Sequence, residues 1–249
     1  MAFGDEIRLF DEEEYATDGE EKFELKLSGD DGDLIKSKER VQHHGEVFTP
    51  KWMVKKMLSE PAIQKKLRDL HATFLEPSAG EGAFLKEILH QKLNYVDEIS
   101  SKTSWKSNAL WALMSIYGIE LLPDNLTRAR AAMLDVFVNH YQVKQQKSLS
   151  ANADLYKAAK YVIEANIVQG NTLEYVDDQG RLIELSHWVP VGDKVQREPF
   201  TYKSLFNNND AADTNAQSGQ LSLFGEEETK RAYKICELTK VYKGEKINE

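Results

Sequence analysis

The alternation of apolar and polar positions along the chain predicts short strands separated by helices. After Pro123, apolar residues recur at helical spacing, so Leu126, Met133, Phe137 and Tyr141 would share one face. We expect helices at 51–58, at 82–90 and from Pro123 onward, and strands at 73–76, 115–120 and 166–170. Strands that alternate with helices are typical of a parallel, doubly wound sheet. The pattern therefore predicts an α/β fold with helices on both faces of the sheet.

The pattern changes toward the C-terminus. Residues 175–185 predict a hairpin with a turn at 177–180. Residues 207–220 are polar, small and without periodicity, as in a linker. The charged stretch 226–249 predicts a terminal helix with a weak apolar stripe of Tyr233, Cys236 and Val241. The expected parts are an arm at 1–40, a main domain at 41–206, a linker at 207–225 and a helix at 226–249.

Acidic residues are concentrated at the N-terminus. Residues 1–33 contain thirteen acidic and three basic residues, whereas the whole chain has a formal net charge of -9, so the remainder is close to neutral. A chain that is basic throughout is excluded, although a local basic patch is not. Acidic arms are most often solvated, and the alternative is an arm that occupies a basic surface of a partner.

Composition and short motifs exclude several classes of protein. The only cysteine, Cys236, cannot form an internal disulfide or a cysteine-based zinc site. His43 and His44 are adjacent, which is poor geometry for chelating one ion, so we expect no metal site. No apolar run approaches the roughly 18 residues that a membrane span requires, and the acidic N-terminus is unlike a secretory signal. We expect a soluble cytoplasmic protein.

The strongest chemical pattern is EPSAGEGAFL, which runs from Glu76 to Leu85 between a predicted strand and a predicted helix. Gly80 and Gly82 permit a tight turn against which a ligand can lie, and the helix start offers free backbone N–H groups. A dinucleotide fingerprint would have its third glycine where Leu85 stands, which disfavours a nicotinamide or flavin site. A glycine turn without a ligand is the alternative.

Glu120 ends the second predicted strand. In doubly wound sheets an acidic residue at this point can accept hydrogen bonds from ribose hydroxyls. Glu120 lies forty residues after Gly80, farther than the roughly 20 residues typical of the fold. We attribute the difference to an insertion around 94–108. An exposed acidic residue with no ligand is the alternative.

Four motifs follow one another along the chain: G-E-V-F-T-P (45–50), E-P-S-A-G-E-G-A-F-L (76–85), Y-G-I-E-L-x-P-D-N (117–125) and Q-G-N-T-L (169–173). In this form and order they resemble adenine-N6 DNA methyltransferases of the gamma class, which occur in restriction–modification systems. The resemblance covers roughly residues 42–173, about half of the chain. It implies a Rossmann-like sheet, S-adenosylmethionine (SAM) as the methyl donor and DNA as the substrate.

The resemblance also implies which residues bind the cofactor. Phe48, Thr49 and Pro50 would border the methionine end of SAM. Glu120 would hold the ribose hydroxyls, and Leu121 would lie beside the adenine. Asn171 occupies a position near the adenine that the family often fills with Asp. The loop cradle and the remaining cofactor contacts would comprise Glu76, Pro77, Ser78, Ala79, Gly80, Gly82, Phe84 and Thr172.

The family's catalytic motif, Asn or Asp followed by Pro-Pro and an aromatic residue, is missing. The six prolines of this sequence include no adjacent pair. About 76 residues follow Leu173, and they show no further strand–helix alternation. In the family's sheet the first strand lies beside the fourth, so strand 73–76 would become an open edge that can pair with another chain. We therefore expect a second subunit to supply the catalytic motif, and no catalytic residue in this chain.

Other interpretations of the motifs stay open. The chain could be a degenerate SAM-binding remnant that works as an adaptor, or its own hairpin could cover the open edge. A SAM loop does not identify the methyl acceptor, so a methyltransferase acting on RNA or protein is a further alternative.

The segment Gln220-Leu221-Ser222-Leu223-Phe224 resembles the pentapeptide with which bacterial proteins bind the sliding clamp. A polar anchor and spaced apolar side chains on a flexible segment suit docking into a groove. The sliding clamp is therefore a second expected partner. The alternative is an apolar patch that holds the terminal helix against the body.

Overall fold

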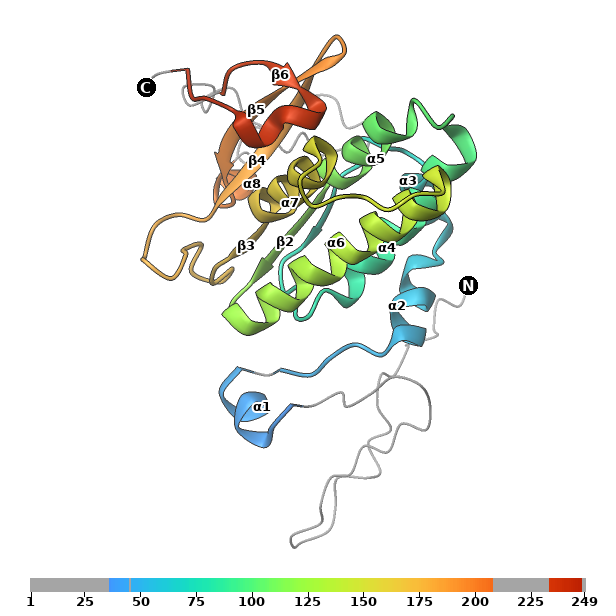
Figure 1. The fold of residues 1–249 in the computed structure, drawn as a ribbon. Helices are drawn as coiled ribbons and strands as arrows, with labels where there is room; N and C mark the ends of the chain where they lie inside the picture. The colour runs from blue at the N-terminus through green and yellow to red at the C-terminus, as the bar shows by residue number, and fades with distance from the viewer. Residues whose placement is uncertain (1–35, 45, 208–232, 248–249) are drawn as a thin grey trace, which may run out of the picture. The chain divides into compact units, whose positions relative to one another are not determined.

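The computed structural model describes residues 36–44, 46–207 and 233–247. Two sheets organise this part of the chain (Figure 1). The first is parallel, in the order β1 (Phe74–Glu76), β2 (Ile116–Glu120) and β3 (Ile167–Gln169). The second is antiparallel, in the order β4 (Glu184–Val191), β5 (Lys194–Thr201) and β6 (Cys236–Glu237). The predicted α/β class is confirmed, and the predicted parallel strands form.

The helices precede and separate the parallel strands. Before β1 lie α1 (Lys38–His44), α2 (Lys51–Leu58) and α3 (Pro61–Leu67). Between β1 and β2 lie α4 (Ala83–Ile99) and α5 (Trp105–Met114), and between β2 and β3 lie α6 (Pro123–Gln145) and α7 (Asp154–Asn166). The short helix α8 (Ser204–Asn207) follows β5, and the 3-10 helix η4 (Leu238–Lys243) follows β6. Proline begins both α3 and α6, where its missing N–H costs no helical hydrogen bond.

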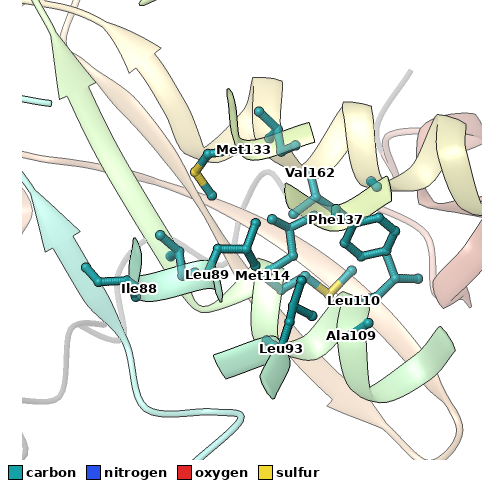
Figure 2. Close-up of a cluster of buried hydrophobic side chains, with 14 of the residues drawn as sticks. Ile88, Leu89, Leu93, Ala109, Leu110, Met114, Met133, Phe137 and Val162 are labelled. Atoms are coloured by element: carbon teal, nitrogen blue, oxygen red, sulfur yellow. The ribbon is translucent and has the colours of Figure 1, made fainter. Parts of the chain in front are cut away.

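One buried cluster joins α4, α5, α6 and α7 to the parallel sheet (Figure 2). The stripe predicted for α6 is buried in this cluster, and it consists of Leu126, Met133, Phe137 and Tyr141. Gly118 of β2 allows α4 to approach the sheet closely, because a Cβ atom there would lie 2.9 Å from Leu85 Cδ1. The helices therefore pack directly on the strand that ends in Glu120.

The opposite face of β2 packs against the antiparallel sheet. Tyr117 and Ile119 share a second buried cluster with Leu185 of β4 and Phe200 of β5. The Tyr117 hydroxyl donates to the Ser186 carbonyl at 2.9 Å. Within the described ranges, the helical layer expected on this face is replaced by the antiparallel sheet, with only the short helix α8 beside it. The two apolar faces of β2 are thus buried by different kinds of structure.

Helices α5 and α7 occur where the sequence pattern predicts no helix. Most of α5 is buried, so it presents no polar face that would reveal its period: Trp105, Ala109, Leu110, Ala112, Leu113 and Met114. The insertion expected around 94–108 is accordingly the end of α4, a short connection and the start of α5. Helices α4 and α5 together account for the long separation between Gly80 and Glu120.

The hairpin predicted at 175–185 forms in part, as a turn whose short arms pair antiparallel without forming continuous strands. The turn itself forms, with the Gly180 N–H donating to the Asp177 carbonyl at 3.1 Å. Its arms, however, are joined by isolated bridges such as Val176 with Leu182. Continuous pairing begins at Glu184, where β4 pairs with β5 over eight residues each.

The predicted terminal helix is wrong over residues 233–247. Cys236 and Glu237 form β6 at the edge of the antiparallel sheet, and a 3-10 helix follows. Leu238 and Val241 of η4 are buried in the main cluster. The predicted clamp-binding segment lies outside the described residues, as does nearly all of the acidic arm and of the linker. The expected boundary of the arm at residue 40 falls within α1.

Strand β1 lies at one edge of the parallel sheet. Among the described residues it pairs with β2 alone, through Phe74 with Ile116 and the two following pairs. The antiparallel sheet covers a face of the parallel sheet and does not extend it at β1. Within the described ranges, then, the alternative in which a local hairpin closes this edge is not realised.

Candidate functional site

A pocket of about 250 Å³ opens at the carboxyl ends of the parallel strands. The loop after β1, the end of β2, the turn after β3 and the segment before α2 meet there. Crevices beyond the carboxyl ends of parallel strands are the usual ligand sites of such sheets. The lining comprises Glu46, Val47, Phe48, Pro77, Ser78, Gly80, Glu120, Leu121, Leu122, Asn125 and 170–173.

Many of the residues predicted to bind a cofactor meet in this pocket. They come from separate segments: Phe48, Pro77, Ser78, Gly80, Glu120, Leu121, Asn171 and Thr172. The other predicted residues lie outside the lining: Thr49, Pro50, Glu76, Ala79, Gly82 and Phe84. Pro50 caps α2 and Gly82 caps α4, so both shape the site through the backbone. Ala79 is buried, and Phe84 packs against the main cluster.

The glycine loop has the backbone conformation that its sequence suggests. Gly80 and Gly82 have φ angles of 54° and 83°, in the left-handed region that favours glycine. The Ala79 N–H donates to the Ile119 carbonyl at 2.9 Å, which ties the loop to β2. Gly82 also makes room for α6, because a Cβ atom there would lie 3.0 Å from Ala129 Cα. These contacts hold Gly80 beside the end of β2.

Glu120 is the central acidic group of the pocket. It is 6% exposed. Its Oε2 accepts the Gly80 N–H at 2.7 Å, and its Oε1 accepts the Leu122 N–H at 2.9 Å. The Asn125 amide also donates to Oε1, at 3.3 Å. A carboxylate offers about four acceptor positions, so Oε2 keeps one that a ligand hydroxyl can use.

Glu76, at the end of β1, is a second acidic group close to the loop. Burial raises the pKa of its carboxyl group, while the Ser78 N–H, which donates to Oε1 at 3.3 Å, acts in the opposite direction. This carboxyl therefore ionises less readily than an exposed glutamate.

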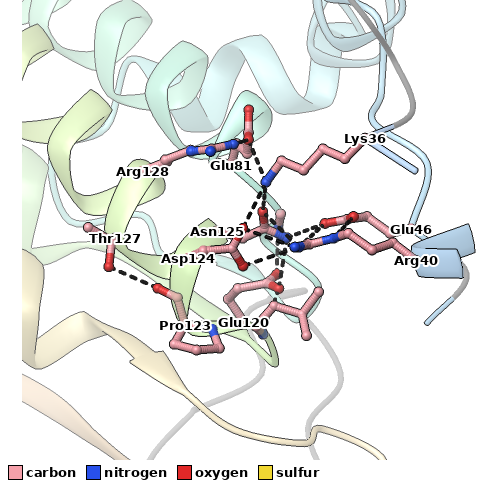
Figure 3. Close-up of polar contacts among 12 residues, drawn as sticks. Lys36, Arg40, Glu46, Glu81, Glu120, Pro123, Asp124, Asn125, Thr127 and Arg128 are labelled. Atoms are coloured by element: carbon pink, nitrogen blue, oxygen red, sulfur yellow. Dashed lines mark hydrogen bonds and ion pairs between the residues drawn. The ribbon is translucent and has the colours of Figure 1, made fainter. Parts of the chain in front are cut away.

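Residues 36–44, which include α1 and form the α1 segment, are attached to the pocket by a polar network (Figure 3). Arg40 pairs with Glu46 through two nitrogen atoms and with Asp124 at 3.0 Å. Lys36 pairs with Glu81 at 2.8 Å and hydrogen-bonds Asn125. Arg40 holds the pKa of both the Glu46 and the Asp124 carboxyl groups below their usual values. Ionised carboxylates thus anchor α1 at neutral pH.

Sequence reasoning missed several lining residues: Glu46, Val47, Leu122, Asn125, Gly170 and Leu173. All six lie within the four motifs, so membership of a motif was the signal that could have identified them. Val47, Leu121 and Leu173 are exposed aliphatic side chains on the pocket wall, at 57%, 45% and 89% exposure. Apolar side chains beside a carboxylate can bind a ligand that has both a flat ring, which the side chains contact, and hydroxyl groups, which the carboxylate binds.

The charge of the lining limits which ligands suit the pocket. Glu46 and Glu120 are acidic, and the described residues that line it include no lysine or arginine. Arg40 compensates the charge of Glu46, but Glu120 accepts only neutral N–H groups from the described residues, so a pyrophosphate beside Glu120 would be repelled. A neutral or cationic nucleoside fits this charge better.

None of the known protein families, curated proteins or solved structures compared with this chain matches it. Among the described side chains, no group of three or more His, Cys, Asp or Glu residues is arranged to hold a metal ion. None of the described helices combines the length and apolar composition needed to cross a bilayer.

Proposed function

We propose that this chain is the SAM-binding portion of a DNA adenine-N6 methyltransferase of a restriction–modification system. The observation that carries the proposal is the pocket in which Phe48, Gly80 and Glu120 meet. These residues belong to three of the four motifs that resemble the gamma-class enzymes, and they come together from distant parts of the sequence. SAM is a cationic nucleoside, which suits an acidic lining with no described lysine or arginine.

The contacts around Glu120 support a role for each part of the ligand. The carboxylate of Glu120, held by the Gly80 and Leu122 N–H groups, would accept hydrogen bonds from the ribose hydroxyls. Leu121 and Leu173 would contact the adenine. The Phe48 ring, which lies 3.6 Å from where a Cβ atom on Gly80 would stand, would border the methionine end. Bound SAM would supply an activated methyl group. The chain's own residues would hold and orient this donor, which lowers the entropic cost of methyl transfer.

The catalytic part would come from a second polypeptide. No two prolines are adjacent in this sequence, so the motif that would hold the adenine's amino group is not in it. The chain after β3 forms an antiparallel sheet over the face of the parallel sheet, and among the described residues β1 pairs only with β2. The free side of β1 is where strands of a partner would continue the sheet.

Recovery of the partner tests this division. We expect a tagged chain isolated from its native cells to bring down, in equal amount, a protein with the Asn/Asp-Pro-Pro-aromatic motif. Mixed with tritiated SAM and unmethylated DNA, the pair should produce N6-methyladenine, and each chain alone should not. The control is a partner in which the aromatic residue of the motif is replaced by alanine. This change should abolish methylation without preventing assembly.

Each other outcome rejects part of the proposal. Methylation of DNA by this chain alone would contradict a divided enzyme. Methyl transfer by the pair to RNA or protein, and not to DNA, would reject the proposed acceptor. Recovery of the sliding clamp alone, or of no partner, would favour an adaptor.

A further inference from the structure

Asn125 connects two carboxylates of the pocket to two cations of the α1 segment. It is 1% exposed at the start of α6. Its Nδ2 donates to Glu46 Oε1 and to Glu120 Oε1. Its Oδ1 accepts hydrogen bonds from Lys36 and Arg40, the latter at 3.4 Å. The amide therefore has its donor side toward the acidic pocket and its acceptor side toward the basic segment (Figure 3).

This arrangement needs an amide specifically. Glu46 and Glu120 are both mostly buried, and their oxygen atoms approach the same Nδ2 group. A donor between two carboxylates screens their mutual repulsion, and a third acceptor there would repel both. An amide offers this donor at every pH while its oxygen accepts from Lys36 and Arg40, whereas a carboxyl group could donate only when protonated.

The α1 segment reaches the pocket through the same contacts. Arg40 binds Glu46, Glu46 binds Asn125, and Asn125 binds Glu120, whose other oxygen holds the Gly80 N–H. Glu46 also lines the pocket, followed directly by Val47 and Phe48. Attachment of α1 thus fixes one wall of the pocket and the carboxylate at its centre together.

We propose that Asn125 and Arg40 are positioning residues that hold Glu120 for the ribose hydroxyls of the ligand, so that the α1 segment completes the binding site. The inference rests on the proposed SAM-binding function. Neither residue need touch the ribose: Asn125 acts through Glu120, and Arg40 acts through Glu46 and Asn125.

The first test is Asn125→Asp, which keeps the size of the side chain and replaces its donor by an acceptor. Calorimetric titration of the full chain with SAM at pH 7.5 should show affinity weakened by about tenfold or more. The new carboxyl would face Glu46 and Glu120 on one side and Lys36 and Arg40 on the other. When this carboxyl group is protonated, its O–H can again donate a hydrogen bond. The difference in SAM affinity between Asn125→Asp and the unaltered chain should therefore become smaller as the pH falls toward 5. Asn152→Asp, on an exposed loop, makes the same charge change and should have no effect.

The second test is Arg40→Gln, whose side chain is 26% exposed and whose loss should not prevent folding. We expect several-fold weaker SAM binding in a chain that still unfolds cooperatively on heating. Lys38→Gln removes the same charge from the same helix, at an exposed position with no contact in this network, and should bind SAM normally.

The outcomes separate this inference from the proposed function. If the unaltered chain does not bind SAM, both are overturned. If it binds SAM and Asn125→Asp or Arg40→Gln binds equally well, only the positioning role is overturned. The positioning role is also overturned if Asn125→Asp lowers the melting temperature and weakens SAM binding by the same factor at every pH, because that result indicates a purely structural role.

Discussion

At the scale of single residues, Lys92 is the least expected feature of the core. Its side chain lies in α4 and is 0% exposed, yet its ammonium group has hydrogen-bond acceptors for all three of its hydrogens. It donates to the carbonyls of Asp69 and Ala72 at 2.8 Å and to Ser115 Oγ at 2.7 Å. These bonds join the loop before β1, α4 and the residue before β2, so this lysine fixes the position of both strands that lead to the pocket.

The stability of the chain should depend on pH through Lys92. Burial lowers the pKa of its ammonium group from 10.5 to about 7. Between these values the unfolded chain binds the proton more tightly, so the free energy of unfolding should rise with pH across this window. Lys92→Met removes the titration and leaves buried acceptors unpaired, which should cost about 1–3 kcal/mol at pH 9. Urea denaturation of both proteins from pH 7 to 10 measures this, and parallel pH curves would contradict it.

Individual site residues were predictable only where they belong to a motif with a known role. Glu120 and Gly80 are placed by the end of a strand and by a glycine turn. Glu46 and Asn125 were missed, although both lie in quoted motifs, because their role depends on each other across 79 positions of sequence. No local pattern contains such a contact.

At the scale of elements, Gly82 lets the start of α4 lie close to Ala129 of α6. Gly82→Ala should strain a positive φ and also press a methyl group against Ala129 of α6. Gly180→Ala is the matched control, since Gly180 has a similar φ of 75° and a Cβ there would meet nothing within 4 Å. We expect Gly82→Ala to lower the free energy of unfolding by about 1–3 kcal/mol more than Gly180→Ala. Equal losses in denaturant titrations would show that helix packing at Gly82 is not tight.

Helix prediction depended on an apolar face that contrasts with a polar one, and α7 is the exception. Helix α6 has a polar outer surface and was predicted, whereas α5 is buried on most sides. Helix α7 carries the apolar spacing in Leu155, Ala158, Val162 and Ile163, although no helix is predicted there from the sequence. The strand β4 was missed because buried Ser186 interrupts its apolar alternation.

At the scale of the whole molecule, the parallel sheet was predictable and the structure over its second face was not. The alternation of strands and helices predicts the parallel sheet, because parallel strands need crossover connections that helices usually supply. The antiparallel sheet reaches that face through long-range contacts such as Tyr117 with Ser186, 69 positions apart. We propose that strands of a partner chain lie beside β1.

The most direct test of the central claim is a calorimetric titration of the purified full chain with SAM. We predict saturable binding at one site per chain. Binding should be about tenfold weaker in Glu120→Gln, which loses the carboxylate charge that we propose holds the ribose hydroxyls. Glu60→Gln, at an exposed position before α3, should bind SAM as the unaltered chain does. No saturable binding by the unaltered chain, or equal binding by Glu120→Gln, would contradict the claim that this pocket is a SAM site.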